Sequence, residues 1–421
     1  MSLTGKEVAQ MHKDYVMQSW ARSGADTLPV ERAEGIYFYD YDGKKYADMA
    51  SLLVCSNLGH ELPEIVEAIK EQADKMCFMA PAYASEPKSM LAKMLVEAAG
   101  ADTYKRVFFT NGGAESNENA IKMARMVTGR TKIFSCYRSY HGATLGASNA
   151  SGDWRRYAAE IGGANGFVHF MNPQMYRDGY TKGVDDAEVT KKYLDALDLQ
   201  LRYEGPGNVA AILMESIVGA NGVILPPDGY MEGVRALCDK YGILLICDEV
   251  MAGWCRTGKV MSYMHYGIKP DIVSMAKALG GGMPIGAICA TAEVAKAFTP
   301  GSHGTTFGGH PVCCAAALAE VNELLDRDLA GNAAKIGAYF MEQLKTLPHV
   351  KEVRGQGLLV GVEFDDTISG VDVKHECLHR HLLITAIGAH IIRLIPPLIV
   401  TEEDCDKAVA IIEETVKALE K

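Results

Sequence analysis

The stretch DIVSMAKALGGGMPIGA, residues 271–287, places a lysine directly after a short apolar segment. Residues 271–275 are predicted to form a buried strand, Lys277 follows it, and glycines at 280–282 precede a second apolar segment. Lysine is among the residues least often buried without a partner. A lysine held by small residues at the end of a buried strand therefore indicates a site that uses its amine.

Apolar segments of strand length recur through the middle of the chain, and helical patterns at 115–127 and 230–241 lie between them. These segments are continuous rather than alternating, which predicts a largely parallel sheet covered by helices on both faces. Ligands of such sheets bind where the carboxyl ends of the strands meet their loops. The predicted strands are residues 106–110, 132–136, 209–215, 242–248, 271–275 and 285–291.

The two ends of the chain have a different pattern. Residues 35–50, GIYFYDYDGKKYADMA, predict a hairpin that turns at Asp42-Gly43. Helices predicted at 332–347 and 403–419 accompany strands predicted at 357–364 and 390–396. We therefore expect an α/β protein with a large domain at 60–310 and a smaller α+β domain built from 1–59 and 311–421.

Composition excludes several classes of protein. The 42 basic and 53 acidic residues give a net charge of −11, which argues against nucleic acid or an anionic membrane as a partner. No run of 18 apolar residues occurs, and the first residues lack the apolar segment of a signal peptide. The 11 cysteines show no CxxC spacing, so we expect free thiols in the cytoplasm and no metal site.

Three further features accompany the lysine. Asp248 ends the most apolar strand, and the turn at 111–114, Asn-Gly-Gly-Ala, leads from a strand into a helix whose N–H groups suit a phosphate. Tyr140 and His141 follow another strand. Together these residues offer a phosphate cradle, an aromatic plate, an anion for a ring nitrogen and an amine for an aldehyde. That combination describes pyridoxal 5′-phosphate (PLP).

Two other kinds of protein fit less well. A dinucleotide-dependent dehydrogenase needs GxGxxG after its first strand and an acidic residue about 20 positions later, and neither is present. A catalytically dead PLP-binding protein would not need the lysine and the aspartate, yet both are intact.

The sequence resembles the class III (omega-type) aminotransferases, which are PLP enzymes of fold type I, and the resemblance covers nearly the whole chain. It implies that fold, PLP as the cofactor and a ping-pong transfer of an amino group. Seven blocks occur in the family's order: NLGHELPEI (57–65), TNGGAESNENAIKMAR (110–125), SYHGAT (139–144), DEVMAGWCRTGK (248–259), SMAKALGGGMPIGA (274–287), HGTTFGGHPVCCAAALA (303–319) and IIRLIPPL (391–398).

The resemblance assigns the catalytic roles to Lys277 and Asp248. Lys277 would form the Schiff base with the cofactor and then move a proton, which requires a neutral amine and hence a depressed pKa. Asp248 would pair with the pyridine nitrogen and keep it protonated, so that the ring withdraws electrons.

Other positions would surround the cofactor or reach it from a second subunit. Tyr140 and Val250 would cover the two faces of the ring, and Thr306 would reach the phosphate from the neighbouring subunit. That last contact implies a homodimer with shared active sites, whose dimers could pair into tetramers. The remaining cofactor positions are Gly113 and Ala114 at the phosphate, and His141 and Glu215 nearby.

Arg393 matches the arginine that binds the substrate carboxylate, and its planar fork suits a carboxylate or a sulfonate. Ala220 replaces the glutamate that masks this arginine in the ornithine and 4-aminobutyrate branch. Ala143 replaces an arginine that holds a distal carboxylate there, which weakens both of these substrate assignments. Met251 stands where some relatives place a glutamine near the cofactor's phenolic oxygen.

Leu53 and Val54 match substrate-contacting positions at the pocket entrance, and both are apolar, which favours a short carbon chain. Arg155 and Arg156 either supply a second anion site or form a solvated basic face. The pattern favours taurine as amine donor, then β-alanine, with pyruvate or 2-oxoglutarate as acceptor. An aminomutase, a decarboxylating transaminase, a racemase and a 4-aminobutyrate or ornithine aminotransferase remain alternatives.

Overall fold

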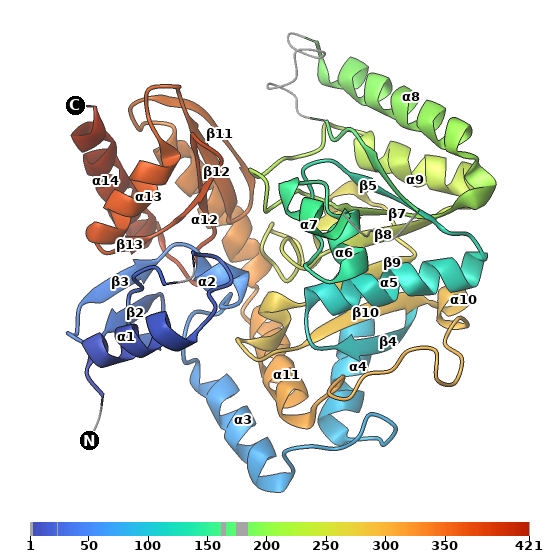
Figure 1. The fold of residues 1–421 in the computed structure, drawn as a ribbon, viewed down its shortest axis with the longest axis horizontal. Coiled ribbons are helices and arrows are strands. Elements are labelled where there is room, and N and C mark those ends of the chain that lie inside the picture. The colour runs from blue at the N-terminus through green and yellow to red at the C-terminus, as the bar shows by residue number, and fades with distance from the viewer. Residues whose placement is uncertain (1–2, 23, 161–165, 174–183, 421) are drawn as a thin grey trace.

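The computed structural model describes residues 3–22, 24–160, 166–173 and 184–420 (Figure 1). A seven-stranded sheet forms its centre, and every strand is parallel to the others except β10, which pairs antiparallel with both of its neighbours. In spatial order the strands are β4 (Tyr104–Thr110), β10 (Gly286–Thr291), β9 (Ile272–Met275), β8 (Leu244–Asp248), β7 (Val209–Glu215), β5 (Lys132–Cys136) and β6 (Phe167–Phe170).

Both faces of this sheet are buried, as the continuous apolar strands predicted. Alternate residues of one strand belong to different apolar clusters: Ile246 packs beneath α5, and Leu245 and Cys247 face the larger cluster on the other side. The predicted α/β class is confirmed. All six strands that were predicted in the middle of the chain are present. Within the central sheet, β6 is the strand that the sequence did not reveal.

Helices cover the sheet on both sides (Figure 1). α5 packs on β7, β9 and β10, α4 packs on β4, and α9 packs on β8. The helices of this part are α3 (Pro63–Lys75), α4 (Glu86–Gly100), α5 (Gly113–Thr128), α6 (Leu145–Ala150), α7 (Tyr157–Glu160), α8 (Asp186–Glu204), α9 (Tyr230–Tyr241) and α10 (Ala292–Ala295), with 3₁₀ turns η1 (Trp154–Arg156), η2 (Pro206–Asn208), η3 (Ser262–Tyr266) and η4 (Lys277–Gly280).

The chain ends form two smaller sheets, of which one contains strands from both ends. The first has the order β1 (Val30–Glu34), β2 (Tyr37–Asp40), β3 (Lys45–Asp48) and β13 (Leu382–Leu383), and the second has β11 (Val350–Gln356), β12 (Leu359–Phe364), β15 (Ile391–Leu394) and β14 (Thr385–Ile387). The predicted hairpin is confirmed as β2 and β3. The helices are α1 (Gly5–Tyr15), α11 (Pro311–Asp326), α12 (Leu329–Leu344), α13 (Gly370–His379) and α14 (Glu402–Leu419).

α11 packs against α3 and α4 as well as α12. The domain boundaries at 59/60 and 310/311 stay a prediction. Within the described ranges, no helix has both the length and the apolar composition needed to cross a membrane.

The segment Ser51–Val54, labelled α2, is a left-handed turn of residues that are not glycine. Its φ angles are 44°, 38°, 67° and 67°. Each such residue costs about 1–2 kcal/mol of backbone free energy. The Asp48 carboxylate accepts hydrogen bonds from the N–H groups of Ala50 and Leu52, and the Ser51 hydroxyl donates to the carbonyl of Ile395. The surrounding structure therefore holds a conformation that the turn alone would not keep.

Replacing a left-handed residue by glycine should relieve this cost. Leu53 is 47% exposed, so its side chain contributes little packing. We expect Leu53→Gly to keep or raise the free energy of unfolding. The control Leu199→Gly lies in the right-handed helix α8, is 45% exposed, and should lose about 1 kcal/mol. Urea unfolding measures both. Equal losses in the two variants would contradict the left-handed turn.

Candidate active site

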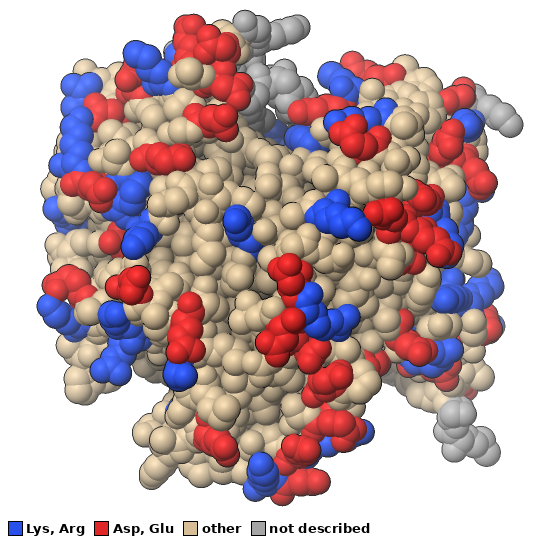
Figure 2. All heavy atoms as spheres, turned by 180° about the vertical axis from the view of Figure 1, so that it is seen from behind, with Lys and Arg blue, Asp and Glu red and all other residues tan. Residues whose placement is uncertain are grey.

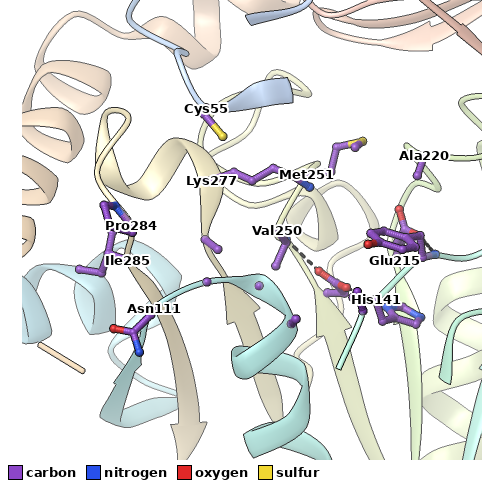
Figure 3. Close-up of a pocket in the computed structure, with 18 of the residues that line it drawn as sticks. Cys55, Asn111, His141, Glu215, Ala220, Val250, Met251, Lys277, Pro284 and Ile285 are labelled. Carbon is purple, nitrogen blue, oxygen red and sulfur yellow. Dashed lines mark hydrogen bonds and ion pairs between the residues drawn. The ribbon is translucent and has the colours of Figure 1, made fainter. Parts of the chain in front are cut away.

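A cavity of about 430 Å³ lies at the carboxyl ends of β7, β8 and β9 (Figure 3). This is the edge of the sheet at which the sequence predicted a site. The cavity is lined by Cys55, Asn111, Gly112, Gly113, Ala114, Tyr140, His141, Gly142, Ala143, Glu215, Ala220, Asp248, Val250, Met251, Ala276, Lys277, Gly282, Met283, Pro284 and Ile285.

Lys277 begins η4 immediately after β9 and extends its side chain across the cavity (Figure 3). Its φ of 49° is a left-handed conformation, which the tight turn after the strand imposes. Burial lowers the pKa of the Lys277 amine below its ordinary value, and the Asp248 carboxylate opposes that effect. The cavity therefore favours a neutral amine, which can act as a nucleophile or a base.

The Asp248 carboxylate is fixed by hydrogen bonds from two directions. Its Oδ2 accepts from Asn117 Nδ2 at 2.8 Å and from His141 Nδ1 at 2.7 Å, and its Oδ1 accepts from the N–H of Val250 at 3.0 Å. His141 Nδ1 therefore carries the proton, and its buried Nε2 has no hydrogen-bond partner within the described residues.

Asn117 links Asp248 to the strand that precedes the lysine. The Ser274 hydroxyl donates to Asn117 Oδ1 at 2.7 Å, so the asparagine amide is oriented with its NH₂ group towards Asp248. The sequence analysis did not single out Asn117 or Ser274. Their signal is a polar side chain on a buried face: Asn117 lies on the buried face of α5, and Ser274 lies within a fully buried strand.

The first turn of α5 forms the floor of the cavity at Gly113 and Ala114. A Cβ on Gly113 would lie only 2.7 Å from Val250 Cγ1, so glycine allows the close approach of helix and strand loop. The N–H groups of a first helical turn have no partner within the helix and favour an anion.

Glu215 ends β7, and its carboxylate is hydrogen-bonded to two loops at the cavity. Its carboxylate accepts from the N–H of Tyr140 at 3.0 Å and from the N–H of Gly219 at 2.9 Å. Burial raises the pKa of Glu215, and the neighbouring His141 and these backbone N–H groups oppose the rise. Tyr140 and His141 are thus placed at the cavity by Glu215 and Asp248, respectively.

Arg393 lies in β15, is buried, and makes hydrogen bonds to uncharged groups. It donates to the carbonyl of Gly219 at 2.9 Å, to Thr385 Oγ1 at 3.2 Å and to Met251 Sδ at 3.6 Å. Burial lowers the pKa of Arg393 to about 10, Glu215 opposes this, and the charge of Arg155 adds to it. Ala220, at the position of the masking glutamate, lines the cavity.

Four predicted site residues do not line the cavity of this chain: Arg393, Thr306, Leu53 and Val54. Thr306 and Leu53 are exposed, and Val54 packs in an apolar cluster with Ile217 and Ile395. From the predicted entrance segment, Cys55 lines the cavity instead, and its sulfur points towards Lys277 (Figure 3). Within the described part of the chain, no group of three His, Cys, Asp or Glu residues could hold a metal ion.

The lowered pKa of Lys277 has a consequence for stability. The unfolded chain holds the lysine proton up to the ordinary pKa of 10.5, whereas the folded protein loses it at a lower pH. Burial of this lysine therefore costs stability when the pH is below 10.5, and the cost is largest below the pKa of the folded protein. In the cofactor-free protein we expect Lys277→Met to raise the free energy of unfolding at about pH 7, with a gain that shrinks towards about pH 10.

Denaturant unfolding of the wild type and the variant at both pH values measures this gain. Lys93→Met, at an exposed position of α4, controls for the general loss of a positive charge. A gain that stays constant or grows with pH would contradict the prediction.

The match with known proteins extends over almost the entire chain. Residues 20–416 match the family described as aminotransferase class-III. The acetylornithine aminotransferase of Methanothermobacter thermautotrophicus is 34% identical, and the match spans 99% of this chain and 100% of that protein.

Two solved structures are close in fold. Taurine:2-oxoglutarate aminotransferase from Bifidobacterium kashiwanohense, in complex with PLP and glutamate, has a TM-score of 0.95 and 54% identity, covering 100% of this chain and 99% of that one. An (S)-enantioselective omega-transaminase from Thermomicrobium roseum has a TM-score of 0.93 and 32% identity over 100% of both chains. The chain therefore belongs to the class III aminotransferases, PLP-dependent transferases of fold type I.

Proposed function

We propose that this aminotransferase moves the amino group of a small omega-amino-sulfonate or omega-amino acid, taurine first and β-alanine next, to a 2-oxo acid. The observation that carries the proposal is Arg393, a buried guanidinium whose hydrogen-bond partners are uncharged and whose usual masking position is occupied by Ala220. An anionic substrate group that reaches this cation would not have to displace a carboxylate.

The residues that line the cavity fit PLP in their chemistry. We assign the phosphate to the N–H groups of Gly113 and Ala114, the pyridine nitrogen to Asp248, and the two ring faces to Tyr140 and Val250, all of which line the cavity. When bound, PLP supplies the aldehyde that receives the amino group and the ring that withdraws electrons from the reacting carbon. His141 and Asn117 hold Asp248 in place for that contact.

Lys277 is proposed as the acid–base catalyst. Its neutral amine would take the proton from the substrate carbon that bears the amino group and pass it to the carbon of the cofactor's aldehyde group. Burial lowers the pKa of this amine and so favours its neutral form. Glu215 keeps the loop of Tyr140 and the loop of Gly219 together, so the ring contact and the Arg393 contact are placed by one carboxylate.

Arg155 gives the site a second cation. Its guanidinium carbon lies 3.9 Å from the centre of the Tyr140 ring, and its charge contributes to the lowered pKa of Arg393. Asp153 pairs with Arg155 and fixes its orientation. We propose that Arg393 and Arg155 together suit a short substrate with an anionic end, and a dicarboxylate such as 2-oxoglutarate as the acceptor.

We also infer a homodimer with shared active sites, in which Thr306 serves the neighbouring subunit. Thr306 is exposed and does not line its own chain's cavity. Figure 2 shows a broad central area of one face with few charged side chains, the composition expected at a subunit contact. A cytoplasmic location is proposed from the 11 cysteines, all of which are free thiols.

The identity of the donor is tested by steady-state rates with taurine, β-alanine, 4-aminobutyrate, ornithine and N-acetylornithine against both acceptors. N-acetylornithine is included because curated relatives are acetylornithine aminotransferases. We expect kcat/KM for taurine to exceed that for N-acetylornithine by about tenfold or more, because Ala143, which lines the cavity, cannot hold the carboxylate at the far end of the longer donor.

Mixing enzyme and donor without acceptor tests the reaction type. Oxo product should form in an amount equal to the enzyme, and the cofactor's visible absorbance should return only after a 2-oxo acid is added. Absorbance that returns unaided, with no oxo product, would exclude transamination. A higher kcat/KM for N-acetylornithine would exclude the proposed donor class while leaving transamination intact.

Introducing the missing carboxylate tests the role of Arg393. Ala220→Glu should form an ion pair with the buried guanidinium and raise KM for the 2-oxo acid by about tenfold or more, because the acceptor then has to displace a carboxylate. Ala220→Gln has nearly the same size without the charge and is the matched control. Equal KM values in the two variants would mean that Arg393 does not bind the acceptor.

A further inference from the structure

Arg256 is a fully buried arginine that donates hydrogen bonds to acceptors in three separate segments. Its guanidinium is 0% exposed and donates to the carbonyl of Pro396, to the carbonyl of Leu358 at 3.1 Å, to Ser51 Oγ at 3.2 Å and to Asn57 Oδ1 at 2.6 Å. All four acceptors are uncharged, and the Asp48 carboxylate supplies an opposing charge. Burying a cation in this way is unfavourable unless its hydrogen bonds are made.

Two of these segments carry a residue assigned to the site, and the third pairs with one of them. Ser51 and Asn57 flank Cys55, whose sulfur points towards Lys277 (Figure 3). Pro396 follows β15, which contains Arg393, and Leu358 precedes β12, which pairs with β15 at Arg393. Arg256 itself lies in the loop that leaves Asp248 at the end of β8.

The backbone at these contacts is unfavourable on its own. Trp254 and Cys255, directly before Arg256, have left-handed φ angles of 54° and 69°, and the turn Ser51–Val54 is left-handed throughout. Asn57 Nδ2 donates to the carbonyl of Trp254, so the two left-handed segments are bound to each other. Backbone of this kind persists only where the surrounding contacts determine it.

We infer that Arg256 is a positioning residue: it holds the turn that presents Cys55 and the strand that presents Arg393 at fixed places relative to Asp248 and Lys277. The part of this inference that concerns Arg393 rests on the proposed aminotransferase function. The part that concerns Cys55 does not, because it is a statement about the structure alone.

The thiol of Cys55 gives a direct measure of the turn. Cys55 is half-buried, Cys77 is exposed, and the other cysteines are buried. In a Cys77→Ser background, the fast phase of reaction with a thiol reagent therefore reports Cys55, which peptide mass spectrometry verifies. The measurement uses the full-length holoenzyme and requires no substrate.

Arg256→Lys keeps the positive charge but cannot reach all four acceptors. We expect it to speed the labelling of Cys55 about tenfold and to raise KM for the 2-oxo acid about tenfold, with a change in kcat below about threefold, since hydrogen bonds to a charged group are lost. Arg256→Met should show larger effects in the same direction. If Arg256→Met does not fold, the labelling rate and the KM of Arg256→Lys alone test the inference.

Arg130→Lys is the matched control. Arg130 also donates to carbonyls of separate segments, those of Val209, Tyr241 and Gly242. These contacts lie at the amino ends of β7 and β8, away from the cavity at the carboxyl ends. A purely structural role for Arg256 predicts equal effects in the two variants, which would overturn the inference.

Wild-type labelling in Arg256→Lys would also overturn the inference. Faster labelling with an unchanged KM would overturn the link to Arg393 and leave the link to the Cys55 turn. If no amino transfer is found at all, the proposed function fails, and the labelling rates still decide the role of Arg256 at the turn.

Discussion

Burying an amine in the cavity is the constraint on which this site depends. Lys277 can act as a base only if it is neutral, and burial favours the neutral form by raising the cost of the charge. The same burial acts on every polar group nearby. Asp248 is therefore held by an amide, an imidazole and a backbone N–H rather than by solvent, and Glu215 is held by backbone N–H groups.

The sequence contained the fold and the centre of the site because both depend on local pattern. Continuous apolar strands mark a sheet that is buried on both faces, and residues at the carboxyl ends of parallel strands must lie near one another. Lys277 and Asp248 were found in this way, and both line the cavity. β6 was not predicted because it is short, only partly buried and interrupted by His169. The antiparallel direction of β10 has no signature in composition.

The rest of the site depends on segments that are distant along the chain. The contact of Asn117 with Asp248 depends on how α5 packs against β8 and β9, which the sequence does not show. The position of Cys55 at the cavity likewise depends on how the N-terminal turn packs near Lys277. Leu53 and Val54 precede Cys55 immediately, but the left-handed backbone turns their side chains elsewhere. The role of Thr306 involves a second subunit and stays a prediction.

The reversed direction of β10 determines how the backbone of Lys277 is held. Because β9 and β10 are antiparallel neighbours, residues 276–285 connect them without a crossover helix, and both ends of that connection are hydrogen-bonded into the same sheet. The backbone of Lys277 is therefore anchored in one sheet on both sides of its loop. Cys55, the lining residue that the N-terminal segment contributes, lies outside that sheet.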